Sequence, residues 1–174
     1  GVDVIAVTSH NHRVGLVLAG LFGFDRSGVM VLPGQEVTSA EFHMIAAGTE
    51  HLIDWRLPAA EAIAAVQQQG GVAIAAHPVN MINSGWDLAA RGTLDGAEIM
   101  HPLRFNHDQK TRELETFFAA SREVNPGIAA VGSTDFHMAA PLGLCRTYVL
   151  TPERTAAAVI TAIRAGRTAA ACGG

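Results

Sequence analysis

Short apolar runs recur along the chain and constrain its fold more than any other feature. They cover residues 2–8, 29–32, 42–47, 72–76, 96–100, 129–131 and 147–150. Continuous apolar runs of this length are typical of strands buried on both faces, as in parallel sheets covered by helices. Helical patterns separate several of the runs, at residues 58–69, 107–124 and 152–165. The alternation predicts an α/β fold with a mainly parallel sheet or barrel.

The boundaries of the predicted helices carry ordinary start and stop signals. Pro58 lies in the first turn of one helix, which stops at Gly70. Thr151 is a predicted N-cap of the last helix, and Gly166 ends it. No repeat, low-complexity segment or interdomain linker interrupts the pattern, so we expect a single domain over residues 1–174.

Ligand-type side chains occur where the apolar runs end. His10, His77 and His101 each follow such a run directly, and Asp135 and His137 follow the run at 129–131. In open α/β sheets and barrels, the carboxyl ends of parallel strands are where ligands bind and catalytic groups converge. We therefore expect these five side chains to meet on one rim, despite their separation in the sequence.

Glu36 and His43 extend this set. Seven residues separate them, which is short enough for a hairpin to bring them together. Asp135 and His137 are two residues apart and would point the same way on an extended segment. Imidazole with carboxylate oxygen is the ligand set of Zn, Mn or Fe sites. A carboxylate such as Glu36 can bridge two ions, which an imidazole cannot.

Each of these residues also has an ordinary structural interpretation. A single His at a strand end is more often a hydrogen-bonded turn residue, and Glu36 alone could be a surface charge after a Pro-Gly turn. Asp135 could cap the next segment. The placement of the whole set favours a metal site, because one explanation then covers every position. His12, His51 and His107 have no such placement, and we expect them to be solvated.

Composition excludes several classes of partner and compartment. The chain has 12 Lys and Arg against 16 Asp and Glu, and its basic residues form no run that could follow a phosphate backbone. Nucleic acid is therefore not favoured as a partner. Cys145 and Cys172 lack CxxC spacing, so we expect neither a disulfide framework nor a zinc finger. No apolar run reaches the roughly 18 residues of a membrane span, and no signal peptide is evident, so a cytoplasmic protein is expected.

Several segments, in order along the chain, resemble motifs of the PHP superfamily, named for polymerase and histidinol phosphatase. The matching segments are DVIAVTSHN (3–11), PGQEVT (33–38), HMIAAG (43–48), GGVAIAAHP (70–78), GSTDFH (132–137), LG (142–143) and AGRT (165–168). Each motif is weak by itself, whereas their common order over nearly the whole chain is specific. The resemblance implies a distorted (β/α)7 TIM-like barrel with two or three metal ions at one rim.

The resemblance also implies roles for individual residues. The implied metal ligands are His10, Glu36, His43, His77, Asp135 and His137, with Glu36 as the bridging ligand. Glu36, Asp135 and His137 form the expected catalytic group. The family reaction is hydrolysis of phosphate esters by a metal-activated hydroxide. We expect His101 and Arg104 to bind the substrate, since the planar guanidinium of Arg suits phosphate.

The chain departs from the family pattern in two places. The family's HxH motif on the opening strand is absent, because the sequence begins at what resembles the second strand. We expect upstream residues to complete that strand, because a barrel without it leaves unpaired backbone edges. Ser9 stands where the family usually has Asp, and its hydroxyl is a poorer ligand without charge.

These departures leave alternative functions open. The leading hypothesis is a metal-dependent phosphoesterase that acts on a small phosphorylated molecule. A catalytically impaired PHP-like structural or interaction domain is the first alternative, and a metal-dependent hydrolase of a non-phosphate ester or carbamate is the second. A nuclease or proofreading module is disfavoured by the acidic balance and the lack of aromatic-basic grooves.

Overall fold

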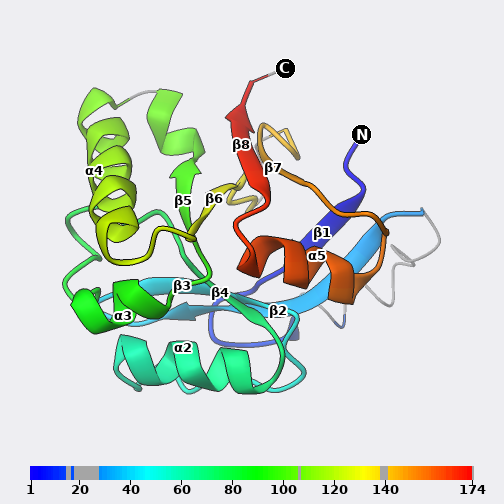
Figure 1. The fold of residues 1–174 in the computed structure, drawn as a ribbon, viewed down its shortest axis with the longest axis horizontal. Helices are drawn as coiled ribbons and strands as arrows, with labels where there is room; N and C mark the ends of the chain where they lie inside the picture. The colour runs from blue at the N-terminus through cyan, green and yellow to red at the C-terminus, as the bar shows by residue number, and fades with distance from the viewer. Residues whose placement is uncertain (15–16, 18–27, 106, 138–140, 174) are drawn as a thin grey trace.

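The computed structural model describes residues 1–14, 17, 28–105, 107–137 and 141–173. It shows a mixed α/β fold built on a curled, six-stranded half-barrel sheet (Figure 1). Each predicted strand run corresponds to an observed strand. Along the sheet, the order is β1 (Val4–Val7), β2 (Met30–Thr38), β3 (His43–Ala47), β4 (Val72–Ala75), β5 (Gly96–Met100) and β6 (Ala129–Gly132).

The sheet is less parallel than the apolar runs predict. The pairs β1–β2, β4–β5 and β5–β6 are parallel, whereas β3 runs antiparallel to both β2 and β4. The reason lies in the connection between β2 and β3, which is too short for a parallel crossover and forms a hairpin instead. Ser39 shapes this turn, because its hydroxyl accepts the backbone N–H groups of Glu41 and Phe42.

A second, two-stranded sheet lies in the C-terminal part of the described chain. It pairs β7 (Cys145–Val149) with β8 (Thr168–Cys172) in antiparallel register. The Ala-rich sequence of β8 has weak strand propensity, which explains why the sequence does not predict it. Cys145 lies opposite Cys172 in this register, and the two form a disulfide. The expectation of unpaired cysteines is therefore wrong, because the pairing depends on a strand that the sequence does not reveal.

Helices lie on both sides of the sheet. The predicted helices are α2 (Ala59–Gln68), α4 (Asp108–Val124) and α5 (Ala156–Arg164). The start expected for α5 at Thr151 is wrong, since Thr155 caps the helix by accepting the N–H of Ala158. Two short elements have too few residues for a periodic pattern and are not predicted from the sequence: α3 (Leu88–Thr93) and the 3-10 helix η2 (Pro102–Phe105).

The sheet forms the middle layer of the core. Ala73 and Ala75 of β4 pack in one cluster with α2, α3 and α4, while Val72 and Ile74 pack in another with α5. Figure 1 shows the sheet between α2 and α5. With both faces of the sheet covered, the strand ends carry the polar side chains. Within the described residues, no helix is both long and apolar enough to cross a bilayer.

Candidate metal centre

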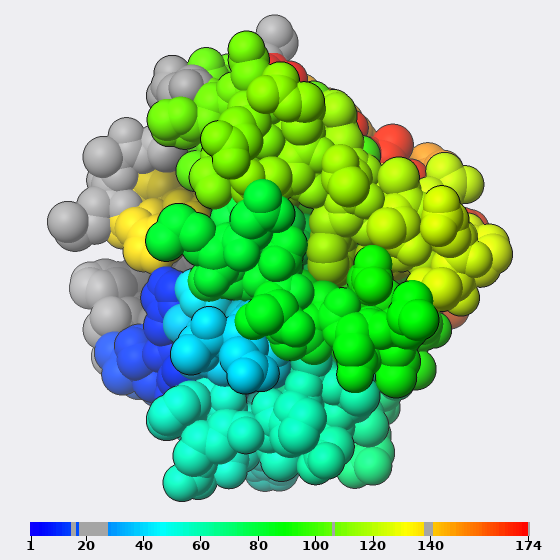
Figure 2. Space-filling view, turned by 90° about the vertical axis from the view of Figure 1, so that its left-hand side faces the viewer, coloured from blue at the N-terminus to red at the C-terminus, as the bar shows by residue number. Residues whose placement is uncertain are grey.

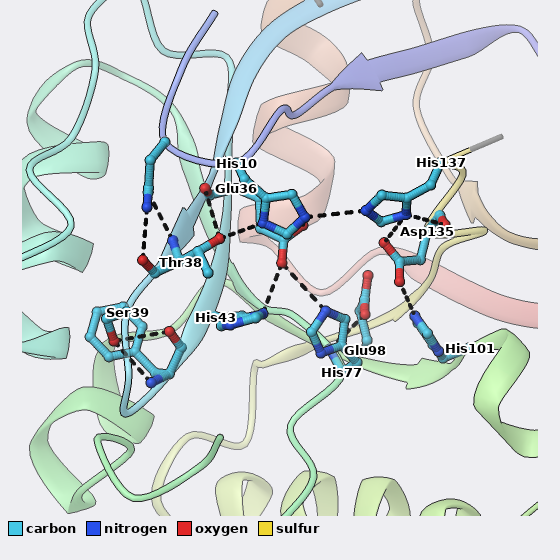
Figure 3. Close-up of polar contacts among 12 residues, drawn as sticks. His10, Glu36, Thr38, Ser39, His43, His77, Glu98, His101, Asp135 and His137 are labelled. Carbon is cyan, nitrogen blue, oxygen red and sulfur yellow. Dashed lines mark hydrogen bonds and ion pairs between the residues drawn. The ribbon is translucent and has the colours of Figure 1, made fainter. Parts of the chain in front are cut away.

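The polar side chains singled out from the sequence meet at one end of the sheet (Figure 3). His10 follows β1, Glu36 lies in β2, His43 opens β3, and His77 follows β4. His101 comes directly after β5, and Asp135 and His137 follow β6. In the space-filling view of Figure 2, the blue, cyan, green and yellow segments that carry these residues meet on one face. The predicted convergence is confirmed.

Glu36 lies at the centre of this group and is held by the β2–β3 hairpin. Glu36 is only 5% exposed. Close approach of the two strands requires Gly34, where an added Cβ would lie 2.5 Å from the carbonyl oxygen of Ala46. The register pairs Thr38 with His43, which brings the His43 ring beside the Glu36 carboxylate. Gly34, which lies within β2 and not in a turn, therefore has a packing role next to the site.

Glu36, His43 and His77 form a group that could hold a cation. Oε1 of Glu36 lies 3.0 Å from Nδ1 of His43 and 3.4 Å from Nε2 of His77. The ligand atoms of the three residues all lie within 4.8 Å of one another. Oε1 of Glu36 and Nδ1 of His43 are buried and lie in ion-pair contact, yet neither atom has a well-oriented hydrogen-bond partner among the described residues. Buried polar atoms of this kind are normally satisfied, so the donor set fits a divalent ion.

The electrostatics of the group keep Glu36 ionised. Burial alone would raise the pKa of this carboxyl, but contacts with His43 and His77 and the nearby charge of His10 lower it to about 2. For His77, burial lowers the pKa, whereas contact with Glu36 and the charges of Glu98, Glu36 and Asp135 outweigh burial and raise it. A carboxylate between imidazoles therefore stays negative at neutral pH.

His10 and His137 form the open side of the centre. Their Nε2 atoms lie 3.2 Å apart, and Nδ1 of His10 is 2.6 Å from the hydroxyl oxygen of Thr38. Nε2 of His10 is also 3.8 Å from Oε2 of Glu36. The side chains of His10 and His137 are 44% and 61% exposed, against 18% for His43. A molecule from solvent would therefore meet His10 and His137 first.

Asp135 links this open side to His101. Oδ1 of Asp135 lies 3.4 Å from Nδ1 of His137, and Oδ2 lies 3.4 Å from Nε2 of His101. Nδ1 of His101 accepts the backbone N–H of Leu103, so the ring proton is on Nε2, which lies beside Asp135 and has no hydrogen-bond partner among the described residues. This contact is the largest cause of the lowered pKa of Asp135, which burial opposes. His101, a predicted substrate contact, is only 3% exposed and faces protein atoms with both ring nitrogens.

The remaining predicted residues occupy less central positions. The guanidinium of Arg104 donates to the carbonyl oxygen of Ile99 and to the carboxylate of Glu115. These two contacts occupy N–H groups that we expected to bind phosphate. Ser9 contributes its carbonyl oxygen, which accepts the backbone N–H of Glu36. The other three histidines are exposed, as expected: His12, His51 and His107.

Glu98 is a site residue that the sequence reasoning missed. It lies in β5, is 1% exposed, and its Oε2 accepts the backbone N–H of His77 at 2.6 Å. A lone carboxylate inside a strand-length apolar run is the signal that could have found it, because buried carboxylates are rare unless paired. His77 and Asp135 also share an unusual backbone, with φ of 28° and 49°. Positive φ at non-glycine residues is concentrated at functional sites.

Comparisons with known proteins agree with this fold. A family model described as PHP-associated matches residues 118–168. A solved two-domain protein from Bacteroides vulgatus ATCC 8482, containing a predicted PHP-like metal-dependent phosphoesterase, is 17% identical with a TM-score of 0.70, covering 98% of this chain and 56% of its own. PsfC from Pseudomonas syringae PB-5123 is 19% identical with a TM-score of 0.67, covering 98% and 77%. Among curated proteins, none matches the sequence significantly.

The chain therefore spans little more than half of the Bacteroides vulgatus structure, in which 56% of the residues are covered. Both solved structures share the mixed α/β fold with its curled sheet. The PHP-associated match over residues 118–168 and the shared fold, added to the ordered motifs, support an assignment to the PHP superfamily.

Proposed function

We propose that this chain is a metal-dependent hydrolase of phosphate esters, a phosphoesterase of the PHP type. The observation that carries the proposal is the group of Glu36, His43 and His77, whose ligand atoms lie within 4.8 Å of one another. Among the described residues, two of these atoms, Oε1 of Glu36 and Nδ1 of His43, are buried without a well-oriented hydrogen-bond partner, and a cation between them would satisfy both. The similar protein from Bacteroides vulgatus, which contains a predicted PHP-like metal-dependent phosphoesterase, supports the same chemistry.

We infer that the centre holds two or three divalent ions, with Zn, Mn or Fe as the candidates that suit mixed imidazole and carboxylate ligands. Glu36 would be shared between ions, with His43 and His77 on its buried side. His10, Asp135 and His137 would hold an ion on the open side. Bound divalent ions supply Lewis acidity and lower the pKa of water, which is the chemistry that ester hydrolysis needs.

The residues of this chain provide charge, orientation and access. Glu36 contributes a fixed negative charge, because its pKa of about 2 keeps it ionised at neutral pH. Asp135 is oriented by the Nε2–H of His101, which faces its Oδ2. A small phosphorylated substrate would approach from the side of His137, whose side chain is 61% exposed. We also propose that the half-barrel belongs to a distorted (β/α)7 barrel, which its curled sheet supports.

Metal analysis combined with ester hydrolysis tests this function. The purified protein would be assayed by elemental analysis and with p-nitrophenyl phosphate, bis(p-nitrophenyl) phosphate and p-nitrophenyl acetate, before and after chelation. We expect two or three ions per chain, and phosphoester hydrolysis that chelation abolishes and added metal restores.

Other outcomes favour the alternatives. Bound metal with hydrolysis of the acetate alone would favour a non-phosphate hydrolase. Bound metal without any hydrolysis would favour an impaired structural or interaction domain, in line with Ser9 at the position where related motifs carry Asp. Phosphoester hydrolysis that survives chelation would contradict the proposed function outright.

A further inference from the structure

Glu98 is a buried carboxylate to which the proposed function gives no role. It lies in the middle of β5 (Gly96–Met100) and is 1% exposed. Among the described residues, its Oε1 has no hydrogen-bond partner. Burial of a charge is unfavourable unless the group is paired. The carboxylate of Glu98 therefore needs an explanation beyond packing.

The contact of Glu98 supplies that explanation. Its Oε2 accepts the backbone N–H of His77 at 2.6 Å, although 21 residues separate the two in the sequence. Charge-assisted hydrogen bonds of this length are the stronger kind. In Figure 3, the Glu98 carboxylate lies beside His77, on the side of the cluster toward Asp135. The hydrogen bond thus reaches the backbone of a residue whose ring faces Glu36.

The backbone of His77 requires such a contact. The ladder between β4 and β5 ends at the pair Ala75 and Ala97, so the sheet gives the His77 N–H no strand partner. The φ of His77 is 28°, outside the regions that L residues prefer. A conformation of this kind persists only where the surroundings impose it. The side chain of Glu98 replaces the missing backbone acceptor at the point where the chain leaves the sheet.

We propose that Glu98 is a positioning residue, which fixes the backbone of His77 through this hydrogen bond and thereby aims the His77 ring at Glu36. That His77 binds a metal ion rests on the proposed function. The hydrogen bond between Glu98 and His77 does not depend on that function. The essential feature of Glu98 is the acceptor oxygen. Its negative charge is not required for the effect.

Two substitutions at Glu98 show whether its acceptor oxygen or its negative charge matters. Glu98→Gln keeps an acceptor oxygen and removes the charge, while Glu98→Met keeps the approximate size and removes both. Thr49→Val is the matched control, because Thr49 is 1% exposed and its hydroxyl has no hydrogen-bond partner among the described residues. All variants would be compared with the wild type in the metal-free and the metal-loaded form.

The metal-free protein gives the first readout. We expect the backbone amide of His77, measured by NMR and hydrogen exchange, to lose its hydrogen-bonded shift and its protection in Glu98→Met but not in Glu98→Gln or Thr49→Val. The melting temperature of metal-free Glu98→Met should fall, because the backbone N–H of His77 loses its acceptor. The His77 amide, and not the melting temperature, therefore decides whether Glu98 positions His77.

Zinc titration gives the second readout. We expect Glu98→Met to weaken Zn²⁺ affinity by about 10- to 100-fold, the range for residues that orient ligands, and Glu98→Gln to stay close to the wild type. An equal loss in both variants, or an unchanged His77 amide in Glu98→Met, would overturn the proposal. A wild type that binds none of Zn²⁺, Mn²⁺ and Fe²⁺ would refute the proposed function, and the metal-free measurement would still decide the role of Glu98.

Discussion

The Nε2 atoms of His10 and His137 lie 3.2 Å apart, although 127 residues separate the two side chains in the sequence. At that distance, one of the two nitrogens donates and the other accepts, and in the alternative tautomer of the donor ring both lone pairs could face a cation. β1 and β6 lie at opposite ends of the sheet order, so the curl of the sheet is what brings these side chains together.

His137→Ala tests whether this pair holds an ion of its own. We expect the metal content to fall by about one ion per chain, because His10 and Asp135 would be the only proposed ligands left for the ion on the open side. The group of Glu36, His43 and His77 should keep its ion. Elemental analysis after dialysis measures the change, with His107→Ala as an exposed control. An unchanged metal content would show that His137 is not a ligand.

Glu36→Gln should reduce phosphoester hydrolysis far more than His51→Ala. Glu36 is 5% exposed and lies between His43 and His77, and a neutral amide cannot supply the negative oxygen that bridging requires. We expect a loss of about 100-fold or more, at the upper end of what altered metal ligation costs. His51 is exposed and should be silent. Initial rates and metal content measure both variants, and equal, small effects would refute the bridging role.

The sequence predicts the residues of the candidate metal centre better than the strand directions and contacts that hold these residues in place. His10, His77 and Asp135 follow from a simple rule, because ligands at strand ends converge wherever strands share a sheet. The antiparallel direction of β3 does not follow from the apolar runs, since it depends on the turn at Ser39. Burial on both faces makes parallel and antiparallel strands alike in composition.

The missed features share a dependence on tertiary contacts. Glu98 matters because its carboxylate accepts the backbone N–H of His77. The ladder between β4 and β5 ends at Ala75, so within the described sheet this N–H has a side chain as its acceptor and not a strand carbonyl. The disulfide between Cys145 and Cys172 likewise depends on the register of β7 and β8. Such partners are set by strand register and backbone direction, which local patterns do not determine.

Gly34→Ala should destabilise the protein and displace Glu36. An added Cβ would lie 2.5 Å from the carbonyl oxygen of Ala46, a backbone atom that can move only if β2 and β3 separate. Overpacking of this kind costs about 1–3 kcal/mol. Denaturant unfolding measures the change, and zinc titration should show weaker binding because Glu36 and His43 lie on the two separated strands.

Gly92→Ala is the matched control for that substitution. Gly92 lies in α3, and an added Cβ would meet nothing within 4 Å. Alanine should stabilise the helix by about 0.5–1 kcal/mol, since glycine loses more backbone entropy on folding. A stability change of the same sign in both variants would contradict the steric role of Gly34.

His101→Phe should raise the pKa of Asp135, whereas His101→Gln should leave it lowered. Nδ1 of His101 accepts the N–H of Leu103, which places the ring proton on Nε2, facing Oδ2 of Asp135 at 3.4 Å. The amide nitrogen of Gln can occupy the position of Nε2 and donate in its place, while Phe cannot. Carboxyl-carbon NMR titration of the metal-free protein measures the Asp135 pKa directly.

Acid stability gives the same contact a second measurement. The pKa of Asp135 is lowered from its ordinary value of 3.8, so the contact stabilises the fold above that pH. The contribution disappears as pH falls through the lower pKa of the folded state, because the protonated carboxyl no longer attracts His101. His101→Phe should therefore lose less stability than the wild type and His101→Gln between pH 4 and acid unfolding. If Phe and Gln follow the same acid profile, His101 does not orient Asp135 through its Nε2–H.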